Sequence, residues 1–324
     1  MRLATFNLES LDLPPKSKIP IELRAEALRP ALARLDADVL CLQEVNGQHV
    51  PDRPERVLLA LDMLLEGTQY ADYHRISTTG PEGIGVADVH NLVTLSRFPI
   101  KSWREVEHEL VPPPMYKMVT AIPPVSKPEP ILFDRPLLLA EIELPDGRLL
   151  TIINLHLRAP LAAAIPGQKQ SPFVWKSIGG WAEGYFLSAV RRAGQALELR
   201  LLLDQLLAED PHRLIAVAGD FNAEDHDTAL RITIAAEEDT GNGALSPGSF
   251  ILLDRSLPAD RCWSVLHHGR PQMLDHIIVS RSLYGYFREI EVHNETLGDE
   301  LVGFGKGLRS AGSYHAPLVA EFAL

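Results

Sequence analysis

Cysteine is scarce in this chain of 324 residues, which contains only Cys41 and Cys262. Two cysteines cannot form the disulfide framework of a small secreted protein. Cys41 lies inside the apolar run 39–42, which is typical of a buried, unreactive thiol. We therefore expect both cysteines to act as small core residues, and we expect the protein in the reducing cytoplasm.

Long apolar runs are also missing. No uninterrupted stretch approaches the roughly 20 residues that a membrane-spanning helix needs, and residues 1–7 lack the apolar segment of a secretory signal. The chain is 46% hydrophobic and 23% charged, which is ordinary for a globular protein. We expect no membrane span and, since neither a linker nor a repeat interrupts the sequence, one domain over residues 1–324.

Basic residues are the minority: 31 Lys and Arg stand against 43 Asp and Glu, a formal net charge of −12. Proteins that bind nucleic acid by neutralising many phosphates usually have the opposite balance. The charge therefore argues against tight, metal-free binding of DNA. Metal-assisted chemistry on phosphate esters stays open, because a bound divalent cation reverses the local sign of the potential.

The apolar pattern predicts strands that recur between helices. Helices are expected over residues 20–35, 53–65 and 188–207, the first of them kinked or divided at Pro30. Eight prolines between residues 111 and 136 exclude a central strand there, and segments 159–181 and 240–248 are expected to be loops. Strands are expected over residues 2–8, 38–44, 90–96, 137–144, 149–157, 214–218, 274–280 and 318–322.

Polar side chains stand at the ends of several of these apolar strands. A buried strand does not normally end in a carboxylate unless a partner neutralises it, because burial of an unpaired charge is costly. Positions so alike, and so widely separated in sequence, predict one shared cleft. They are Asn7, Glu44, Asn154, His156, Asp220, Asn222, Asp275, His276 and His315.

Short motifs surround these positions: Phe6-Asn7, Leu42-Gln43-Glu44, Asn154-Leu155-His156, Gly219-Asp220-Phe221-Asn222, Leu274-Asp275 and Ser313-Tyr314-His315-Ala316-Pro317. In type and order they resemble the endonuclease/exonuclease/phosphatase superfamily. The resemblance implies an α/β fold: a four-layer α/β/β/α sandwich of two facing mixed sheets with outer helices and a site at one edge. It also implies metal-dependent hydrolysis of a phosphate ester with Mg²⁺ or Mn²⁺, hard cations that prefer carboxylate and carbonyl oxygens.

The resemblance assigns the metal and phosphate contacts residue by residue. Glu44 corresponds to the glutamate that holds the divalent ion, with Asn7 beside it as a ligand or phosphate contact. Glu9 stands where some members carry an acidic metal-site residue, although a surface carboxylate fits its position equally well. Asn154 corresponds to a further phosphate contact.

The resemblance also assigns the catalytic roles. Asp220 corresponds to the aspartate that orients or activates a metal-activated water, and Asn222 to a phosphate contact, although a turn alone would explain one of the two. His315 corresponds to a histidine partnered by Asp275, whose carboxylate fixes the tautomer and raises the pKa of the ring for proton transfer. His156 matches a second histidine of the deoxyribonuclease-like members, a candidate acid for the leaving oxygen.

One residue departs from the family pattern. Tyr314 stands where most members have an aspartate, and a tyrosine cannot supply a carboxylate, so a second metal position is in doubt unless Glu9 compensates. Around the site, we expect His276 to face the other side of its strand as a core or supporting residue, Arg97 to serve turn structure, and Asn91 to lie near the cleft.

Substrate choice depends on loops, which a fold-level resemblance does not reach. The residues after Asn222 and Asp275 differ from those of inositol 5-phosphatases, which favours a nuclease or another phosphodiesterase acting on a phosphate ester such as nucleic acid. The alternatives are an enzyme for small-molecule or lipid-headgroup phosphate esters, and a catalytically silent binding module. No protein partner is indicated.

The insert 158–187 is the candidate for substrate specificity. Bases could stack on its aromatic side chains while its lysines meet phosphates, or the aromatics could pack onto their own domain. These residues are Lys169, Phe173, Trp175, Lys176, Trp181 and Tyr185.

Overall fold

The computed structural model describes residues 1–51, 53–305 and 310–324. Within them, two six-stranded sheets dominate. The first sheet contains, in order across it, β17 (Phe287–Val292), β18 (Leu318–Phe322), β1 (Arg2–Leu11), β2 (Val39–Val45), β4 (Asn91–Ser96) and β3 (His74–Ser77). The second contains β13 (Ile251–Leu252), β16 (Asp275–Val279), β12 (Leu214–Asp220), β9 (Leu149–His156), β8 (Leu137–Glu143) and β5 (Ile100–Val106).

Both sheets are mixed. In the first, β1 and β2 are parallel, and in the second β9 and β12 are parallel, while the other neighbours run antiparallel. Buried side chains of both sheets, among them Val39, Cys41, Ile152 and Ile277, share one core. The sheets therefore face each other, as expected.

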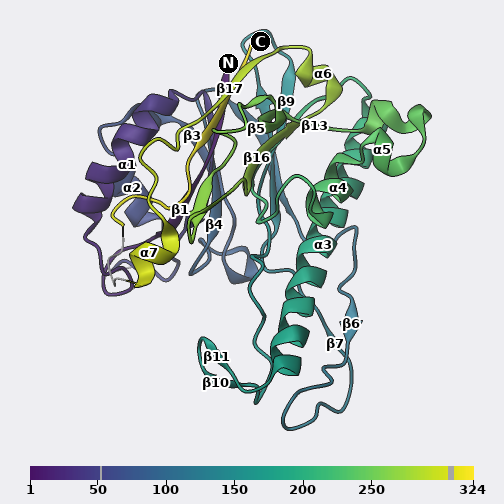
Figure 1. Cartoon of the computed structure of the whole chain (residues 1–324). Helices are drawn as coiled ribbons and strands as arrows, with labels where there is room; N and C mark the ends of the chain where they lie inside the picture. The colour runs from purple at the N-terminus through teal and green to yellow at the C-terminus, as the bar shows by residue number, and fades with distance from the viewer. Residues whose placement is uncertain (52, 306–309) are drawn as a thin grey trace.

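Helices cover both outer faces (Figure 1). The first sheet packs against α1 (Ile21–Leu35) and α2 (Leu59–Leu65), and the second against α3 (Ile178–Glu209) and α4 (Thr228–Ile234). Shorter helices are α5 (Glu237–Thr240), α6 (Arg281–Tyr284) and α7 (Glu300–Gly305). The four-layer α/β/β/α sandwich is confirmed.

Helix α1 is one helix, although Pro30 lies inside it. Leu28, Leu32 and Leu35 share its buried face and pack into the core of the first sheet. This burial is worth several kcal/mol, on the order of 2 kcal/mol per leucine, which offsets the hydrogen bond that the proline cannot donate. Helix α2 is shorter than the expected 53–65, because Val57 pairs with Gln48 in an extended bridge.

Helix α3 begins ten residues before the expected residue 188, inside a segment expected to be a loop. Its N-cap is Ser177, whose Oγ accepts from the Gly180 amide at 3.0 Å. The glycines permit close packing rather than a loop: a Cβ at Gly184 would lie 2.3 Å from the Ala163 carbonyl oxygen. With 32 residues, the helix is about 48 Å long and extends beyond the sheets.

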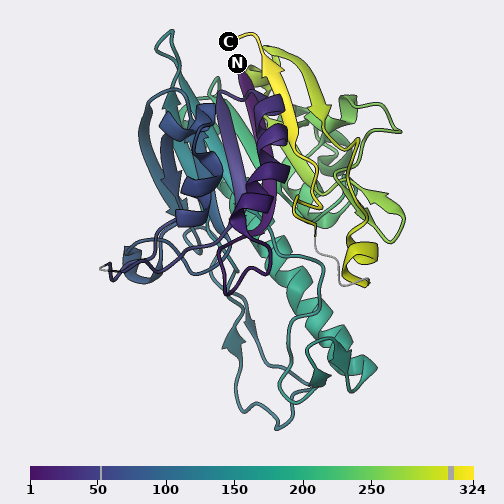
Figure 2. The ribbon, with the colours of Figure 1, turned by 90° about the vertical axis from the view of Figure 1, so that its left-hand side faces the viewer.

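We call the part beyond the sheets the arm. It contains the first turns of α3 and two small hairpins, β6 (Met115–Tyr116) with β7 (Glu129–Pro130) and β10 (Lys169–Ser171) with β11 (Val174–Trp175), all projecting below the sandwich (Figures 1 and 2). Glu183 of α3 fixes the proline-rich segment, because its carboxylate accepts hydrogen bonds from Tyr116, Val119 and Thr120.

Sequence reasoning missed the four edge strands β3, β5, β13 and β17, and also the hairpin of β14 (Val265–His267) and β15 (Arg270–Gln272). The final strand has the bounds that the sequence predicts, and the other predicted strands differ from the observed ones by a few residues at their ends. No helix among the described residues is long and apolar enough to cross a membrane.

Candidate functional site

The candidate site lies where strands of the two sheets end together, away from the chain termini (Figure 1). Asn7 of β1 joins the sheets: its Nδ2 donates to Asp220 Oδ2 of β12 at 3.0 Å and lies 3.3 Å from Glu44 Oε1 of β2. His156 ends β9, beside Asp220. The parallel pairs thus bring residues far apart in sequence to one edge, as expected.

Glu44 lies at an irregularity in the first sheet. The register of β2 shifts against both neighbours near it, and its φ is 58°. Such a bulge redirects a side chain. Glu44 Oε2 accepts from the amide of Ser10 at 2.9 Å and from its hydroxyl at 3.1 Å. Burial favours the protonated form, but His90, His315 and the Asn7 amide outweigh it and lower the pKa of Glu44, so the residue is a carboxylate at neutral pH.

Asp220 follows the glycine of its motif. Gly219 has a φ of 156°, and a Cβ there would lie 2.0 Å from the Leu155 carbonyl oxygen, so this close approach of β12 to β9 requires glycine. Asn222 donates its amide to Asp220 Oδ1 at 2.8 Å and its Nδ2 to the Leu157 carbonyl at 3.0 Å. Burial first, and then the charge of Asp275, raise the pKa of Asp220.

His315 and Asp275 form a close pair. His315 Nδ1 lies 2.8 Å from Asp275 Oδ2, which leaves Nε2 on the side of Asp220, 4.0 Å from Oδ2. Burial opposes protonation of His315, but the carboxylates of Asp275, Asp220 and Glu44 outweigh it and raise the pKa to about 10. The ring is therefore an imidazolium at neutral pH, with an N–H available beside Asp220.

His156 is neutral, unlike His315. Its Nε2 lies 3.3 Å from Asp220 Oδ2 and 3.9 Å from Glu44 Oε1. Burial, followed by repulsion from Arg135, lowers the pKa of His156 well below its usual value. A neutral imidazole is a poor proton donor, which weakens the expectation that His156 protonates the leaving oxygen.

Glu9 and Tyr314 meet at the open side of the site. Glu9 Oε2 accepts the backbone amide of Tyr314 at 2.8 Å, and burial raises the pKa of Glu9 to about 7. Both residues line a pocket of 520 Å³ together with Glu44 and His315. Basic and acidic side chains both line the pocket, among them Lys16, Lys18 and Arg24 and also Asp12 and Glu300.

Asn154 is not brought to this edge. Its side chain is fully buried between the sheets, where Oδ1 accepts from Gln43 Nε2 at 2.8 Å and Nδ2 donates to the Val93 carbonyl at 3.0 Å. The carboxamide therefore links the two sheets, and burial keeps it from a substrate phosphate.

The supporting residues behave differently from one another. His276 lies on the far face of β16 and contacts Asp254 and the Ala223 carbonyl, as expected of a core residue. Arg97 forms an ion pair with Asp38 at 2.8 Å, in agreement with a structural role. Asn91 does not reach the cleft, because its carboxamide bonds to neighbouring backbone groups, including the Val45 carbonyl.

Three residues near the site were missed. His90, just before β4, places Nδ1 3.6 Å from Glu44 Oε2. Arg135 donates to the His156 carbonyl at 3.2 Å, and Arg24 of α1 donates to the Leu8 carbonyl. Arg135 and Arg24 enter from a proline-rich loop and a helix, where no strand-end pattern marks them. His90 was noticed only as the start of a strand.

The aromatics of the insert divide into two sets. Trp175 packs against the small apolar core of the arm, with Lys169 Nζ 4.8 Å from its ring centre. Phe173 is 94% exposed, and Trp181 and Tyr185 of α3 are also exposed, with ring centres 5.6 Å apart. One aromatic side chain of the insert therefore stabilises the arm, and the exposed ones are free to contact another molecule.

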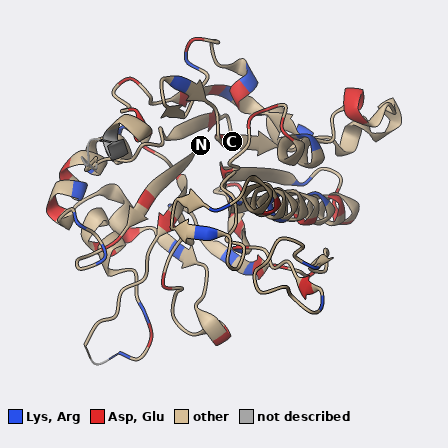
Figure 3. Cartoon of the chain, turned by 60° about the horizontal axis from the view of Figure 1, so that its bottom comes forward, with Lys and Arg blue, Asp and Glu red and all other residues tan. Residues whose placement is uncertain are grey.

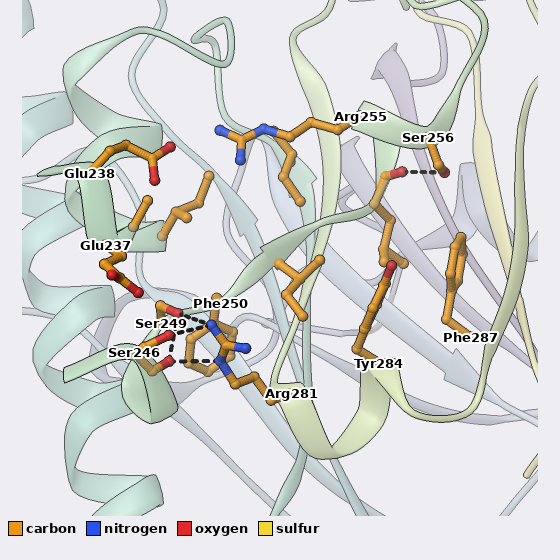
Figure 4. Close-up of a pocket in the computed structure, with 15 residues that line it drawn as sticks. Glu237, Glu238, Ser246, Ser249, Phe250, Arg255, Ser256, Arg281, Tyr284 and Phe287 are labelled. Carbon is orange, nitrogen blue, oxygen red and sulfur yellow. Dashed lines mark hydrogen bonds between the residues drawn. The ribbon is translucent and has the colours of Figure 1, made fainter. Parts of the chain in front are cut away.

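A second pocket, of 390 Å³, shares no residue with the site (Figure 4). Arg281 there donates to the Ser246 carbonyl at 2.7 Å and to Ser249 Oγ at 3.1 Å, so its guanidinium serves the local structure. At the end of the molecule that carries the candidate site, acidic and basic residues are interspersed rather than gathered into one basic face (Figure 3).

Among the residues that the structure describes, two groups of three could hold a metal ion: Glu44, His90 and His156, and Asp220, Asp275 and His315. In each, the donor atoms lie within 4.8 Å of one another. The second group already has an internal pair, since Asp275 holds His315 Nδ1. Glu44 is therefore the better centre for a cation, with Asn7 and Glu9 adjoining it.

Comparisons with known proteins identify the fold. The chain matches solved structures of the 3′ phosphatase NExo from Neisseria bound to a product DNA hairpin (15% identity, TM-score 0.55, all of both chains) and of an AP endonuclease from Archaeoglobus fulgidus (16%, 0.53, all of both chains). It also matches truncated TDP2 from Caenorhabditis elegans (14%, 0.56, 99% of this chain and 96% of that one). At such identities the likeness shows the fold.

No curated protein matches the sequence. The model of the Endonuclease/Exonuclease/phosphatase family matches residues 4–299, nearly the whole chain. The chain therefore belongs to the endonuclease/exonuclease/phosphatase family of metal-dependent phosphoesterases.

Proposed function

We propose that this protein is a phosphodiesterase that hydrolyses nucleic acid with the aid of a divalent cation, Mg²⁺ or Mn²⁺. One observation carries the proposal: an imidazolium, His315, and a buried carboxylate with a raised pKa, Asp220, face each other across 4.0 Å beside Glu44 and Asn7. A proton donor, a proton acceptor and a cation-binding carboxylate thus surround one point.

The residues present fit a cation at Glu44. Its carboxylate is ionised, the Asn7 carboxamide lies 3.3 Å from Glu44 Oε1, and Glu9 lines the same pocket as Glu44. A divalent cation held there would neutralise the charge of a phosphate group and stabilise the additional charge of its transition state.

The side chains supply the remaining chemistry. Asp220, held by the amides of Asn222 and Asn7, orients a water molecule and accepts its proton. The raised pKa makes this carboxylate a stronger base than an exposed aspartate. His315 donates its Nε2–H to a phosphoryl oxygen, and Asp275 fixes the ring for that task. Asn222 follows Asp220 in the loop after β12 and is the proposed phosphate contact, although its Nδ2 already donates to the Leu157 carbonyl at 3.0 Å.

The arm is an argument for a polymeric substrate. It projects from the same end of the sandwich as the site (Figures 1 and 2) and exposes Phe173, Trp181 and Tyr185. Base stacking on such side chains is worth about 1–3 kcal/mol per base. The overall acidic charge agrees with a substrate held through a cation and stacking rather than through many lysines.

The test is hydrolysis of a panel of esters with and without Mg²⁺ or Mn²⁺. The panel contains supercoiled plasmid, single-stranded and hairpin oligonucleotides, a 3′-phosphorylated oligonucleotide, bis(p-nitrophenyl) phosphate and p-nitrophenyl phosphate. We expect cation-dependent cleavage of the nucleic acids, lowered at least about 10²-fold in His315→Ala and unchanged in His74→Ala, a control at an exposed position on β3.

Other outcomes separate the alternatives. Turnover of monoesters alone would indicate a phosphatase, and turnover of lipid-headgroup or small diesters alone would indicate a different phosphodiesterase. No turnover of any ester would support a silent binding module, the function that Tyr314 in place of the usual aspartate favours.

A further inference from the structure

His90 has a left-handed backbone conformation. Its φ is 59°, in a region that few non-glycine residues occupy and in which asparagine, aspartate and histidine are enriched. The amide of His90 donates to Asn46 Oδ1 at 2.8 Å, which fixes the turn before β4. This turn directs the imidazole toward Glu44. Strain of this kind gathers at functional sites.

The imidazole of His90 has no hydrogen-bond partner at Nδ1 among the described residues, although that atom is buried. Its distance of 3.6 Å to Glu44 Oε2 is too long for a hydrogen bond. The side chain is 33% exposed as a whole, so the ring is reachable from solvent while its nitrogen faces inward. A buried nitrogen that has no partner and lies beside a carboxylate indicates that a further atom, such as a bound ion, joins the two groups.

His156 approaches Glu44 from the other side. Its Nε2 lies 3.9 Å from Glu44 Oε1, and the rings of His90 and His156 are 6.3 Å apart at 68°. The three donor atoms lie within 4.8 Å of one another. Donors that share a cation at about 2.1 Å each lie about 3–3.5 Å apart, so closure by roughly 1 Å of side-chain movement would complete the site.

We propose that Glu44, His90 and His156 form a cation site with two imidazole donors, and that it selects Mn²⁺, Co²⁺ or Zn²⁺ over Mg²⁺. The inference rests on the proposed function, because it names the cation of that same site. Imidazole nitrogen suits transition-metal ions, whereas Mg²⁺ takes oxygen ligands. His156 then serves as a ligand through Nε2, the nitrogen that lies nearest to Glu44.

The test measures binding rather than turnover. The purified full chain is stripped with a chelator and titrated with Co²⁺, whose visible absorption reports nitrogen coordination, and with Mn²⁺, Zn²⁺ and Mg²⁺ by calorimetry. Pulsed electron paramagnetic resonance of the Mn²⁺ complex detects ¹⁴N of imidazoles bound to the ion. We expect Mn²⁺ and Zn²⁺ to bind at least about tenfold more tightly than Mg²⁺.

The variants are His90→Ala and His90→Asn. Asparagine tolerates the left-handed backbone and cannot extend its side chain to the imidazole position, so it guards against a folding defect, which thermal melting checks. Both variants should weaken Mn²⁺ and Zn²⁺ binding by about 10–100-fold, reduce the ¹⁴N signal and leave Mg²⁺ affinity within about threefold. His74→Ala, which is exposed on β3, should bind as the unaltered chain does.

Unaltered Mn²⁺ and Zn²⁺ affinity in both variants, or no ¹⁴N coupling in the unaltered chain, would overturn the inference. Its failure is distinguishable from that of the proposed function. Ester hydrolysis with Mg²⁺ and no imidazole coordination would refute the site alone. Imidazole coordination without hydrolysis of any ester would refute the function alone.

Discussion

Alkaline pH should destabilise this protein through one buried histidine, His276. The ring is fully buried. Nδ1 lies 3.1 Å from both carboxylate oxygens of Asp254, and Nε2 lies 2.8 Å from the Ala223 carbonyl oxygen. Because both nitrogens face acceptors, the imidazolium fits better than the neutral ring. Burial opposes the charge, but Asp254 and the Ala223 carbonyl outweigh it and raise the pKa of His276 to about 9.

The magnitude follows from the difference between the folded and unfolded states. In the unfolded chain the pKa of a histidine is about 6.5. Below that pH both states hold the proton, and the stabilisation is fully present. Between pH 6.5 and about 9 the unfolded chain releases its proton first, so the contribution declines and is lost above the folded pKa. Each pH unit is worth about 1.4 kcal/mol, so the full contribution is about 3 kcal/mol.

The assay is urea unfolding of the unaltered chain and His276→Gln at pH 6 and at pH 9.5. Other groups titrate over this range, so the informative quantity is the difference in free energy of unfolding between the two proteins. We expect this difference to shrink by about 3 kcal/mol from pH 6 to pH 9.5. A difference that stays the same at both pH values would refute a charged His276–Asp254 pair.

Three further predictions concern the site and the arm. Asp275→Asn should lower kcat for ester hydrolysis by about 10²–10⁴-fold and move the basic limb of the pH–rate profile to lower pH, because His315 would lose the carboxylate that holds its proton; an unmoved limb would contradict this. Glu9→Gln should raise the free energy of unfolding at pH 8 by about 1–3 kcal/mol, with a smaller gain at pH 5, since burial raises the pKa of Glu9 to about 7; equal gains at both pH values in urea unfolding would count against it. Phe173→Ser should change stability by less than about 0.5 kcal/mol, because the side chain is 94% exposed, and should raise KM for oligonucleotides but not for nitrophenyl esters; equal KM values would exclude the arm from substrate binding.

Much of the fold and part of the site could be predicted from the sequence. Runs of buried apolar residues, such as those in β8 and β12, leave few alternatives to a strand, and β18 has the bounds that the sequence predicts. Asn7, Glu44 and Asp220 meet as expected, because parallel strands align their carboxyl ends. The glycines at the start of α3 indicate a loop by propensity, but in the helix they provide space for the Ala163 carbonyl and other neighbours.

The other differences between the predicted and the observed site have two causes. One is the depth at which a side chain lies in the sandwich, and the other is the tertiary contacts that bring a residue to the site. Asn154 is two residues before His156 on β9, which places it about 7 Å deeper in the sandwich, where it bonds to Gln43 instead of reaching solvent. Alternation along a strand identifies a face but not a depth. Arg135 and His90 reach the site from connections between strands, and their positions depend on contacts that no local pattern encodes.

The hydrogen bond between Asn154 and Gln43 spans the two sheets, and the residues that we propose act on a phosphate are divided between those same sheets. The gap between Glu44 on one side and Asp220 on the other is therefore set by the thickness of the apolar layer beneath them, to which Cys41 and Ile152 contribute. A substitution that lets the sheets settle by a fraction of an ångström would change the distance between Glu44 and Asp220, and we expect it to alter the turnover rate as well as the stability. In this architecture the hydrophobic core acts as a spacer between the two halves of the proposed active site.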